Sequence, residues 1–423
     1  MLNIHRRGFL ATSGMLALAG ASAWGRPVGA NERVRLGVSG TRGRGAELAG
    51  AFAKRSDVAI VSLCDVDDAS FAPASRALAK AGSGGPSPKV EKDFRRVLDD
   101  REVDAVVVAT PDHWHALMTV MACQAGKDVY TEKPASHNVV EGRRMVEAAR
   151  KYDRVVQMGI QRRSMPHVAE AVAHVREGGI GTVGMARAWI FKERLPIGPP
   201  EPAAVPAGVD YAMWQGPAPD RPFATNHFHY NWHWFWNWGT GELGNNGIHG
   251  LDVARWGLGV DAPLAVASTG GNYVYKDREV PDTQVVTWEF PDSCLVWEHR
   301  LWDQHPIEGL GFGIAFYGTK GVLTVDEKGW QVAGGSKAGG KATAGLDAHL
   351  ANFLDCVRTR QRPNADIEVG HLSTRLCHLG NIAHRVGRKL AFDAATESFP
   401  GAADANALLA REYSPRFALP AQA

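Results

Sequence analysis

The stretch Arg33-Val-Arg-Leu-Gly-Val-Ser-Gly-Thr-Arg-Gly-Arg-Gly45 runs from a short apolar strand into a glycine-rich turn, and an alanine-rich helical pattern follows at Ala46–Lys54. A strand, a glycine turn and a helix in this order present backbone N–H groups and a helix N-terminus to a pyrophosphate. The turn departs from Gly-x-Gly-x-x-Gly, because Arg42 takes the second glycine position while Gly45 keeps the third. The stretch predicts the first unit of a Rossmann dinucleotide-binding domain.

The turn itself supplies the first candidate contacts of the cofactor. A backbone that approaches a pyrophosphate closely needs small residues, and an arginine in the same place offers its guanidinium to the phosphate instead. The candidates are Gly40, Thr41, Arg42, Gly43, Arg44 and Gly45.

A carboxylate at the end of the next strand is the candidate contact of the adenosine ribose. The apolar run Val58–Leu63 ends at Cys64-Asp65-Val66-Asp67, and Asp65 lies 25 residues beyond Gly40. A carboxylate there accepts hydrogen bonds from both ribose hydroxyls and repels a 2′-phosphate, which favours NAD over NADP. NADP stays an alternative because two turn arginines would offset the repulsion. Asp67 is the alternative ribose ligand, and helix capping is the alternative role of Asp65.

The alternation of strands and helices continues to residue 160 and predicts a parallel sheet. We expect strands at 105–109, 128–131 and 155–158, and helices at 91–100, 115–125 and 140–151. The first of these strands ends at Thr110-Pro-Asp-His-Trp-His115 and the second at Glu132-Lys133-Pro134. Both sequences therefore lie at the carboxyl edge of the sheet, where open α/β sheets bind ligands.

Lys133 is the candidate proton carrier at that edge. A partly desolvated ammonium has a lowered pKa and becomes a usable proton donor or acceptor near neutral pH. The alternative is a surface lysine beside Glu132 at a strand end.

An aromatic run in the second half of the chain is the candidate substrate wall. A segment rich in Pro, Gly and Ala at 195–224 precedes His227–Trp238, in which four tryptophans alternate with other residues. Indole faces stack on the C–H faces of sugar rings, and neighbouring polar groups bind the hydroxyls. The alternative is a core between domains, since tryptophans are usually buried. The candidates are Trp232, His233 and Trp234.

A second polar cluster follows at Asn245, His249 and Asp252. Their spacing places them on one face if a helix begins here. Asparagine is a poor metal ligand, and a strand-end loop of a dinucleotide site explains His113 and His115 better than zinc does. We therefore expect no metal.

Segment 283–333 alternates apolar and polar residues between hairpin signals, which predicts an antiparallel sheet. Helical patterns follow at His349–Thr359 and at about 370–388. The whole chain has 423 residues and predicts two domains. We expect a Rossmann domain at 31–163, an α/β substrate and oligomerisation domain at 164–395 whose C-terminal helices pack back on the first, and a tail at 396–423.

The N-terminus resembles a Tat export signal. Arg6 and Arg7 precede a short, weakly hydrophobic segment, Phe9–Ala23, that ends in Ala-Ser-Ala. Residues 1–30 are thus expected to be a signal and linker read by the Tat machinery, with a periplasmic or otherwise exported product. Removal of residues 1–23 leaves 45 basic against 45 acidic residues, so no net field attracts nucleic acid or anionic membranes. Five scattered cysteines without CxxC spacing predict buried thiols.

Together these pieces resemble the Gfo/Idh/MocA oxidoreductases over residues 33–393. The resemblance is carried by the turn at 40–45, Cys64-Asp65, the segment 109–115, Glu132-Lys133-Pro134, and Gly247-Ile-His-Gly-Leu-Asp252, with support from Gly318–Gly321 and Asn352–Asp355. Members pair a Rossmann domain with an α/β domain that has a large, open, mostly antiparallel sheet. They commonly oxidise or reduce sugars and polyols with NAD(P), and the exposed sheet face implies a homo-oligomer.

The resemblance also implies roles for individual residues. Lys133 matches the catalytic lysine, His249 matches the histidine near the reacting carbon, and Asn245 falls where many members have aspartate. The nicotinamide ribose side would be lined by Thr110, Pro111, His115 and Glu132. Gln161 and Arg162 would lie near the nicotinamide or the substrate. Lys133 would also contact the cofactor, and Asn245 and His249 would contact the substrate.

Three functions follow. An exported enzyme meets little free NAD, which implies a tightly bound cofactor that is recycled in each cycle of an NAD(P)-dependent sugar oxidoreductase. The second function is an NAD-dependent glycoside hydrolase that works by transient oxidation and elimination. Glycosidases of the N-acetylgalactosaminidase type in this family lack Glu-Lys-Pro, so its presence favours the oxidoreductase. The third is a non-catalytic sugar-binding protein with structural NAD, which the retention of Lys133 and His249 opposes.

Overall fold

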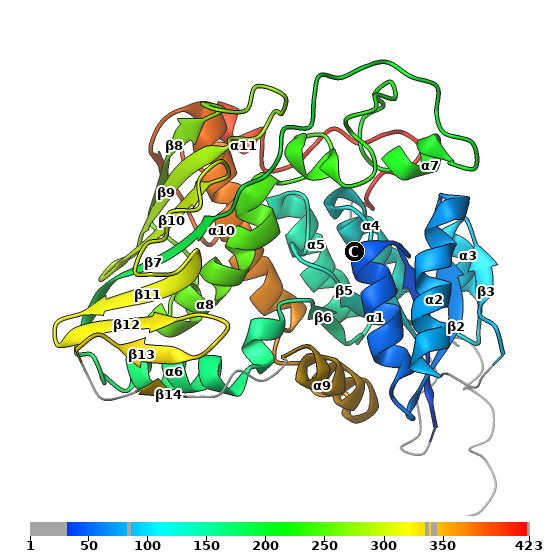
Figure 1. Cartoon of the computed structure of the whole chain (residues 1–423), viewed down its shortest axis with the longest axis horizontal. Helices are drawn as coiled ribbons and strands as arrows, with labels where there is room; N and C mark the ends of the chain where they lie inside the picture. The colour runs from blue at the N-terminus through cyan, green and yellow to red at the C-terminus, as the bar shows by residue number, and fades with distance from the viewer. Residues whose placement is uncertain (1–31, 83–85, 335–337, 340–344, 421–423) are drawn as a thin grey trace, which may run out of the picture.

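The computed structural model of the chain describes residues 32–82, 86–334, 338–339 and 345–420 (Figure 1). The expected export signal at 1–30 lies outside these residues and stays a prediction. Within the described part, no helix combines the length and apolar character needed to cross a membrane.

The first domain is built on a six-stranded sheet in the order β3-β2-β1-β4-β5-β6, and every neighbouring pair is parallel. Its strands are β1 Val34–Ser39, β2 Val58–Cys64, β3 Lys89–Glu91, β4 Ala105–Val108, β5 Asp128–Thr131 and β6 Val156–Met158. Its helices are α1 Gly43–Ala53, α2 Phe71–Ala81, α3 Phe94–Asp99, α4 Asp112–Gln124 and α5 Val139–Lys151. The strand order reverses between β1 and β4, which creates a crevice at their carboxyl ends. The predicted Rossmann domain is confirmed.

Two boundaries differ from the sequence expectation. The region expected as one helix at 91–100 contains the end of the short edge strand β3 and then α3, because Asp93 caps that helix through the amide of Arg95. Helix α4 begins at Asp112, three residues earlier than expected, with Pro111 as its extended N-cap residue. Residues 112–115 are therefore the first turn of a helix at the carboxyl edge of the sheet.

The second domain contains a nine-stranded sheet in the order β14-β13-β12-β11-β7-β10-β9-β8-β15. Only β7 and β10 pair in parallel, so the predicted mostly antiparallel sheet is confirmed. The strands are β7 Val183–Phe191, β8 Ala265–Gly271, β9 Thr283–Glu289, β10 Cys294–Arg300, β11 Phe312–Gly318, β12 Gly321–Val325, β13 Trp330–Val332, β14 Ala338–Gly339 and β15 Leu390–Ala391.

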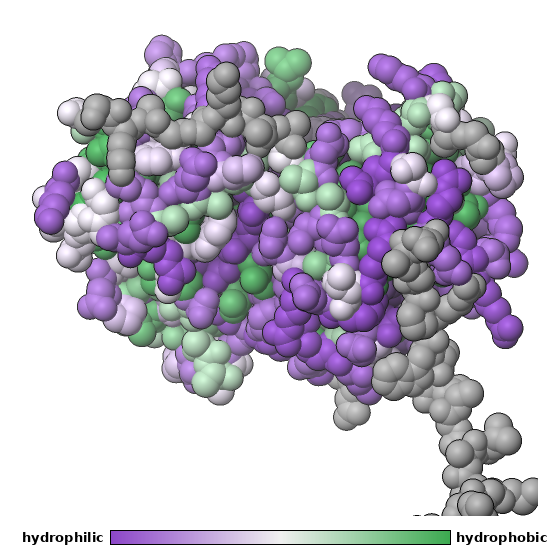
Figure 2. Space-filling view, turned by 90° about the horizontal axis from the view of Figure 1, so that it is seen from below, coloured by the Kyte–Doolittle hydropathy of each residue, from purple (hydrophilic) through white to green (hydrophobic). Residues whose placement is uncertain are grey.

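Helices α8 (Ile248–Leu258) and α10 (Ile367–Val386) lie between this sheet and the first domain (Figure 1). Alternate strand residues such as Trp288, Trp297 and Phe316 are fully buried beneath them. Helix α6 (Pro166–Arg176) packs beside α8, and α9 (Gly345–Thr359) places Phe353 against Tyr130 of β5. The surface seen from below is largely hydrophilic, with apolar residues in small groups (Figure 2).

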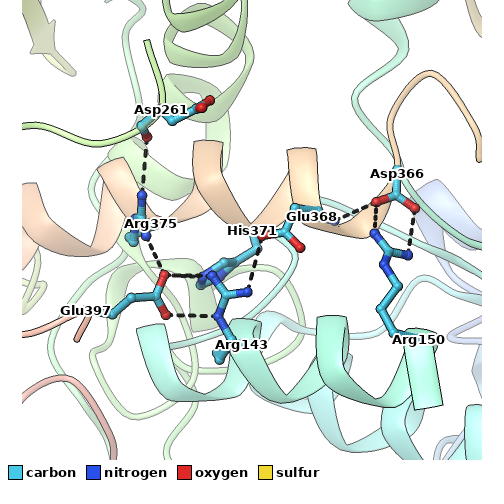
Figure 3. A network of polar contacts seen from close by, with 8 residues as sticks. All are labelled: Arg143, Arg150, Asp261, Asp366, Glu368, His371, Arg375 and Glu397. Atoms are coloured by element: carbon cyan, nitrogen blue, oxygen red, sulfur yellow. Dashed lines mark hydrogen bonds and ion pairs between the residues drawn. The ribbon is translucent and has the colours of Figure 1, made fainter. Parts of the chain in front are cut away.

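Charged groups join α10, α5 and the C-terminal segment (Figure 3). The Glu397 carboxylate accepts hydrogen bonds from Arg143 of α5 at 3.0 and 3.1 Å and from Arg375 of α10, and it lies 2.8 Å from His371 Nε2. Beyond it, the short helix α11 (Ala403–Asn406) and the described remainder of the expected tail pack on the protein, with Ser414 N donating to Pro217 O at 3.0 Å. The C-terminal segment therefore braces the loops above the first domain.

Those loops form the long connection from β7 toward α8, residues 192–240, called the excursion below. It contains the short helix α7 (Tyr211–Gln215) and lies over the carboxyl edge of the parallel sheet (Figure 1). Asp210 N donates to Val66 O at 2.9 Å, and Val209 forms a β-bridge with Asp67. The excursion thus covers the crevice of the first domain.

Candidate active site

A cavity of about 690 Å³ lies between the carboxyl edge of the parallel sheet and the excursion. The strand ends of β1, β2, β4 and β5 supply one wall, and the excursion together with the start of α8 supplies the other. A volume of this size accommodates an extended organic ligand.

At one end of the cavity, the turn after β1 forms an anion cradle. Gly40 has a positive φ of 82°, and a Cβ on Gly45 would lie 1.7 Å from Gly40 O, so both positions require glycine. The first amides of α1 have no partner within the helix and face the same space, where the helix dipole favours an anion. Gly40, Gly43 and Arg44 line the cavity. This cradle fits a pyrophosphate.

Arg42 lines the same end, but its guanidinium is half-exposed and lies 3.4 Å from the Asp67 carboxylate. Arg44 donates through Nε to Glu132 Oε1 at 2.8 Å, and its Nη1 lies 3.0 Å from Glu47. Both arginines are thus held by carboxylates of the protein.

Asp65 is held in place by the turn. Its carboxylate accepts hydrogen bonds from Thr41 N at 2.7 Å, Thr41 Oγ1 at 3.2 Å and Asp67 N at 3.2 Å. Burial raises the pKa of Asp65 above its ordinary value. Thr41 itself does not line the cavity, so it orients Asp65 and does not face the ligand.

Asp67, the alternative ribose ligand, is engaged elsewhere. It accepts from Ala69 N at 3.0 Å as the N-cap of the 3₁₀-helix Asp68–Ser70, and its Oδ2 lies 2.8 Å from His229 Nε2. The capping role considered for Asp65 therefore belongs to Asp67, and of these two carboxylates it is Asp65 that lines the cavity.

The loops after β4 and β5 are tied together. His115 Nδ1 lies 2.7 Å from Pro134 O, and its Nε2 lies 2.8 Å from Thr110 O. Thr110, Pro111 and His115 line the cavity, as does Glu132, which has room because a Cβ on Gly159 would lie 2.7 Å from its Oε1. These residues form a fixed wall midway along the cavity.

Lys133 and His249 meet at the other end. Lys133 Nζ donates to Asn245 O at 2.8 Å and to Asn245 Oδ1 at 3.0 Å. Burial lowers the pKa of Lys133 and sets that of His249 well below its ordinary value. The structure therefore brings an amine and an imidazole from two domains to one cavity, each with its proton affinity reduced by burial.

The helical face expected for Asn245, His249 and Asp252 is interrupted. Asn245 belongs to a π-helix, Leu243–Gly247, and α8 begins only at Ile248. Asp252 turns away, where its carboxylate accepts from Arg163 Nε at 2.9 and 3.0 Å and from Ser373 Oγ at 2.6 Å. Only the first two residues of the cluster line the cavity.

Two expected substrate residues, Arg162 and Trp234, do not line the cavity. Gln161 lines it, but the neighbouring Arg162 donates through Nη2 to Glu327 at 2.9 Å and stacks over Phe312. Trp234 is buried in a separate aromatic core with Trp238. The 3₁₀-helix Asn231–Trp234 repeats every three residues, so alternate tryptophans do not share a face.

The remaining aromatic candidates do form the second wall. Trp232, His233 and Tyr230 line the cavity, and the Trp232 and His233 rings stack with centroids 3.6 Å apart. His233 Nδ1 lies 2.6 Å from Tyr230 O, and burial lowers the pKa of His233 to about 3. The wall therefore combines two flat faces with a neutral imidazole.

Sequence reasoning gave no role to several lining residues. Asp112 is buried beside Lys133, and its Oδ2 accepts from Thr240 Oγ1 at 2.6 Å. From α7, Met213 and Trp214 line the cavity, and Trp214 O accepts from Trp114 Nε1 at 3.1 Å. Asp112 lay within the strand-end motif and was detectable there, whereas α7 carries no motif.

Two family models match the chain. Residues 34–160 match the Gfo/Idh/MocA model described as an oxidoreductase family with an NAD-binding Rossmann fold. Residues 182–304 and 340–419 match the model of the C-terminal alpha/beta domain of the same oxidoreductase family.

Curated relatives match parts of the chain. A glycosyl hydrolase family 109 protein of Stenotrophomonas maltophilia is 36% identical over 142 residues, which cover 31% of this chain and 30% of the relative. The uncharacterized oxidoreductase YrbE of Bacillus subtilis is 25% identical over 56% of this chain and 59% of its own. Inositol 2-dehydrogenase 2 of Saccharopolyspora erythraea is 28% identical over 55% and 56%. The chain thus spans about a third to three fifths of the length of these relatives.

Solved structures share the fold over most of the chain. GenD2 from gentamicin A biosynthesis, in complex with NAD, superposes with a TM-score of 0.66 at 20% identity over 87% of this chain and 99% of its own. The WlbA dehydrogenase from Bordetella pertussis, in complex with NADH and UDP-GlcNAcA, gives 0.66 at 19% identity over 86% and 99%. At this identity the likeness concerns the fold.

Proposed function

The chain belongs to the Gfo/Idh/MocA oxidoreductase family, and we propose that it is an NAD-dependent oxidoreductase of a sugar or sugar derivative that keeps its cofactor bound throughout the cycle. The observation that carries the proposal is the meeting of Lys133 and His249, from two domains, in the cavity that has Asp65 at its other end. A nucleotide cradle and a proton-transfer pair therefore share one space.

The turn at 40–45 would hold the pyrophosphate, and Asp65 would accept from the adenosine ribose hydroxyls. Thr110, Pro111 and His115 would line the nicotinamide ribose, together with Glu132. Bound in this way, NAD supplies the hydride acceptor. Asp65 favours NAD over NADP because it would repel a 2′-phosphate.

Lys133 takes the proton of the substrate hydroxyl. Its lowered pKa makes the neutral amine accessible, and Asn245 holds Nζ in place through two acceptors. His249 polarises the same oxygen, and the Trp232 face stacks on the sugar ring. Because Asn245 is an amide, the proton transfer rests on Lys133 and His249.

The excursion supports retention of the cofactor. Its backbone pairs with the loop after β2 through Val209 and Asp210, and His229 contacts Asp67 beside the cradle. Release of a nucleotide would require these contacts to open. A retained cofactor must be returned to its starting state in each cycle, for example by a second sugar. We further propose export through residues 1–30 and a homo-oligomer through the open face of the nine-stranded sheet.

A second candidate is an NAD-dependent glycoside hydrolase. It is favoured by the family 109 relatives and by His233, a neutral imidazole near Lys133. After transient oxidation of the sugar, His249 or a neighbour such as His233 or Tyr230 would remove the proton adjacent to the carbonyl and so permit elimination of the aglycone. Addition of water to the resulting double bond and return of the hydride to the carbonyl carbon would complete the hydrolysis.

Two measurements test these functions. Denaturation of the purified protein should release about one NAD per chain, seen by absorbance, whereas folded protein without nucleotide would contradict retention. Purified protein is then given free sugars and aryl glycosides separately. Reduction of the bound cofactor by a free sugar supports the oxidoreductase, and aglycone release without net NADH supports the hydrolase. Bound NAD with neither activity supports a non-catalytic sugar-binding protein.

A further inference from the structure

Glu242 is a buried residue, only 1% exposed. Its carboxylate contacts Asn245, the residue whose two oxygens accept hydrogen bonds from Lys133 Nζ. The Glu242 oxygens accept hydrogen bonds from the side-chain amides of Asn245, at 3.4 Å, and Asn246. Arg194 Nη2 lies 3.2 Å from both oxygens. A charge this deeply buried is tolerated only with such partners.

The carboxylate determines which way the Asn245 amide points. A carboxylate only accepts hydrogen bonds, so the NH₂ group of Asn245 faces Glu242 and its oxygen faces Lys133 Nζ at 3.0 Å. If the amide turned over, its NH₂ would face the ammonium and this contact with Lys133 would be lost. Glu242 therefore acts on Lys133 through Asn245.

The same carboxylate reaches the aromatic wall. Arg194, held by Glu242, donates through Nη1 to the Tyr230 hydroxyl at 3.3 Å, and Tyr230 lines the cavity. One buried group thus connects the proton carrier with the excursion.

We propose that Glu242 is the positioning residue of Lys133, which orients the Asn245 amide and supplies a buried negative charge where many family members have an aspartate at position 245. This inference rests on the proposed role of Lys133 in proton transfer. It adds a residue to the site that neither touches the substrate nor lines the cavity.

The electrostatic consequence has a definite sign. Burial lowers the pKa of Lys133, and the negative charges of Glu132, Asp112 and Glu242 oppose that effect. Among the described residues, the other titratable or charged groups near Lys133 are Arg44, His115, His233, His249 and Cys377. Loss of Glu242 removes one opposing charge and leaves the Arg194 cation unpaired, and both changes lower the pKa of Lys133 further.

The test measures the protonation of Lys133 directly. The full-length protein is labelled with acetic anhydride over a range of pH, and acetylation of Lys133 is quantified by mass spectrometry, with the exposed Lys89 as internal control. Only the neutral amine reacts, so the labelling midpoint reports the pKa. Glu242→Gln should lower the Lys133 midpoint by about one pH unit, and Arg194→Met should raise it. The double variant Glu242→Gln/Asn245→Asp returns the negative charge and should bring the midpoint back to the wild-type value or above.

An unchanged Lys133 midpoint in folded Glu242→Gln protein would overturn the inference. If that variant does not fold, Arg194→Met decides the matter, because it removes the cation that pairs with Glu242, and a midpoint that does not rise would contradict the proposal. Reduction of bound NAD by D-glucose and by myo-inositol, followed in the same variants, tests the proposed function separately. Shifted midpoints without hydride transfer in the wild-type protein would remove the oxidoreductase function and leave the positioning role of Glu242 intact.

Discussion

The two walls of the cavity are built in different ways. On the Rossmann side, Asp65, Thr110 and Lys133 each lie at or just beyond the end of a parallel strand, so backbone geometry alone brings them to one edge. On the excursion side, Tyr230 and Trp232 lie in a segment with little regular structure, and side-chain packing holds them in place.

This difference corresponds to two tasks of the site, binding of the cofactor and binding of the substrate. Strand-end loops and helix N-termini suit a constant ligand such as a dinucleotide, whose phosphates and ribose are bound by backbone amides and one carboxylate. The excursion is attached through a few backbone hydrogen bonds and an aromatic core, so its lining residues are free to vary with the substrate. We infer that the first wall determines the cofactor and the second determines the sugar.

The strongest test of the Rossmann wall is Lys133→Ala. Removal of the proton carrier should reduce the rate of bound-NAD reduction by about 10³-fold, within the range for loss of general acid–base catalysis. The NAD content and the melting temperature should stay close to wild type, because the side chain faces the cavity. Stopped-flow absorbance at 340 nm measures the rate. Near-normal turnover would show that another group moves the proton.

For Trp238→Ala, in the aromatic core of the excursion, we expect a loss of stability and no specific loss of catalysis. Trp238 is fully buried, with its ring 5.0 Å from Trp214 and 4.8 Å from His227. Its truncation should destabilise the protein by about 3 to 5 kcal/mol in urea unfolding, as for other buried aromatic side chains. Activity lost in proportion to unfolding would place Trp238 in the core. A stable but inactive protein would contradict that assignment.

The difference between the two walls explains which site residues could be predicted from the sequence. Apolar strands that end in polar residues led directly to Asp65, Thr110, Glu132 and Lys133, because the carboxyl ends of all strands in a parallel sheet lie at the same edge. The same logic reached Asp112 only as part of a motif, since its burial beside Thr240 depends on the second domain.

The sequence of the excursion did not indicate in this way which of its residues line the cavity. Four tryptophans at alternate positions suggested a shared face, but a 3₁₀ turn divides them between the cavity and the core. Similarly, Gln161 and Arg162 are neighbours in the 3₁₀-helix Gln161–Ser164, so they point in different directions, and only Gln161 lines the cavity. Glu242 carried no signal, because burial and partners distant in sequence define its role.

The Glu397 cluster, which joins α5, α10 and the C-terminal segment, gives a pH-dependent prediction. Burial alone would raise the pKa of Glu397, but hydrogen bonds from His371 and Arg143 outweigh it and hold the pKa well below its ordinary value of 4.5 (Figure 3). The contribution to stability is therefore complete above pH 4.5 and is lost as the pH falls through the lower pKa of the folded state.

Glu397→Gln should accordingly reduce the free energy of unfolding by about 3 kcal/mol at pH 7, because it removes the carboxylate that pairs with the buried Arg375 and the partly exposed Arg143. The difference from wild type should shrink as the pH falls below 4.5. Urea unfolding at several pH values measures it. A difference that does not change with pH would mean that the negative charge of Glu397 does not stabilise its cluster with Arg143 and Arg375.

Asp65→Asn tests whether the Rossmann wall determines the cofactor. The amide keeps the shape and the hydrogen bond from Thr41 N but removes the negative charge. Affinity for NAD should fall by about tenfold, and discrimination against NADP should weaken, since a hydrogen bond to a charged group is worth about 1.5 to 3 kcal/mol. The bound nucleotide is first removed by unfolding, the protein is refolded without it, and calorimetric titration with both cofactors then measures the two affinities. Unchanged preference would shift the role of ribose ligand to another group.

Trp232→Ala is the mildest change and the most specific test of the excursion wall. Trp232 is partly exposed to the cavity, stacks on His233 and packs against the aromatic core around Trp234, as Trp236 does. Its loss removes a flat face and leaves the buried members of that core in place. Stacking on a ligand is worth about 1 kcal/mol, so KM for the sugar should rise about fivefold to tenfold while NAD binding and stability change little. Trp236→Ala is the matched control, because Trp236 packs near Arg385 and does not line the cavity. If both variants raise KM equally, the effect comes from a loosened excursion, and the sugar-binding face must be sought elsewhere on that wall.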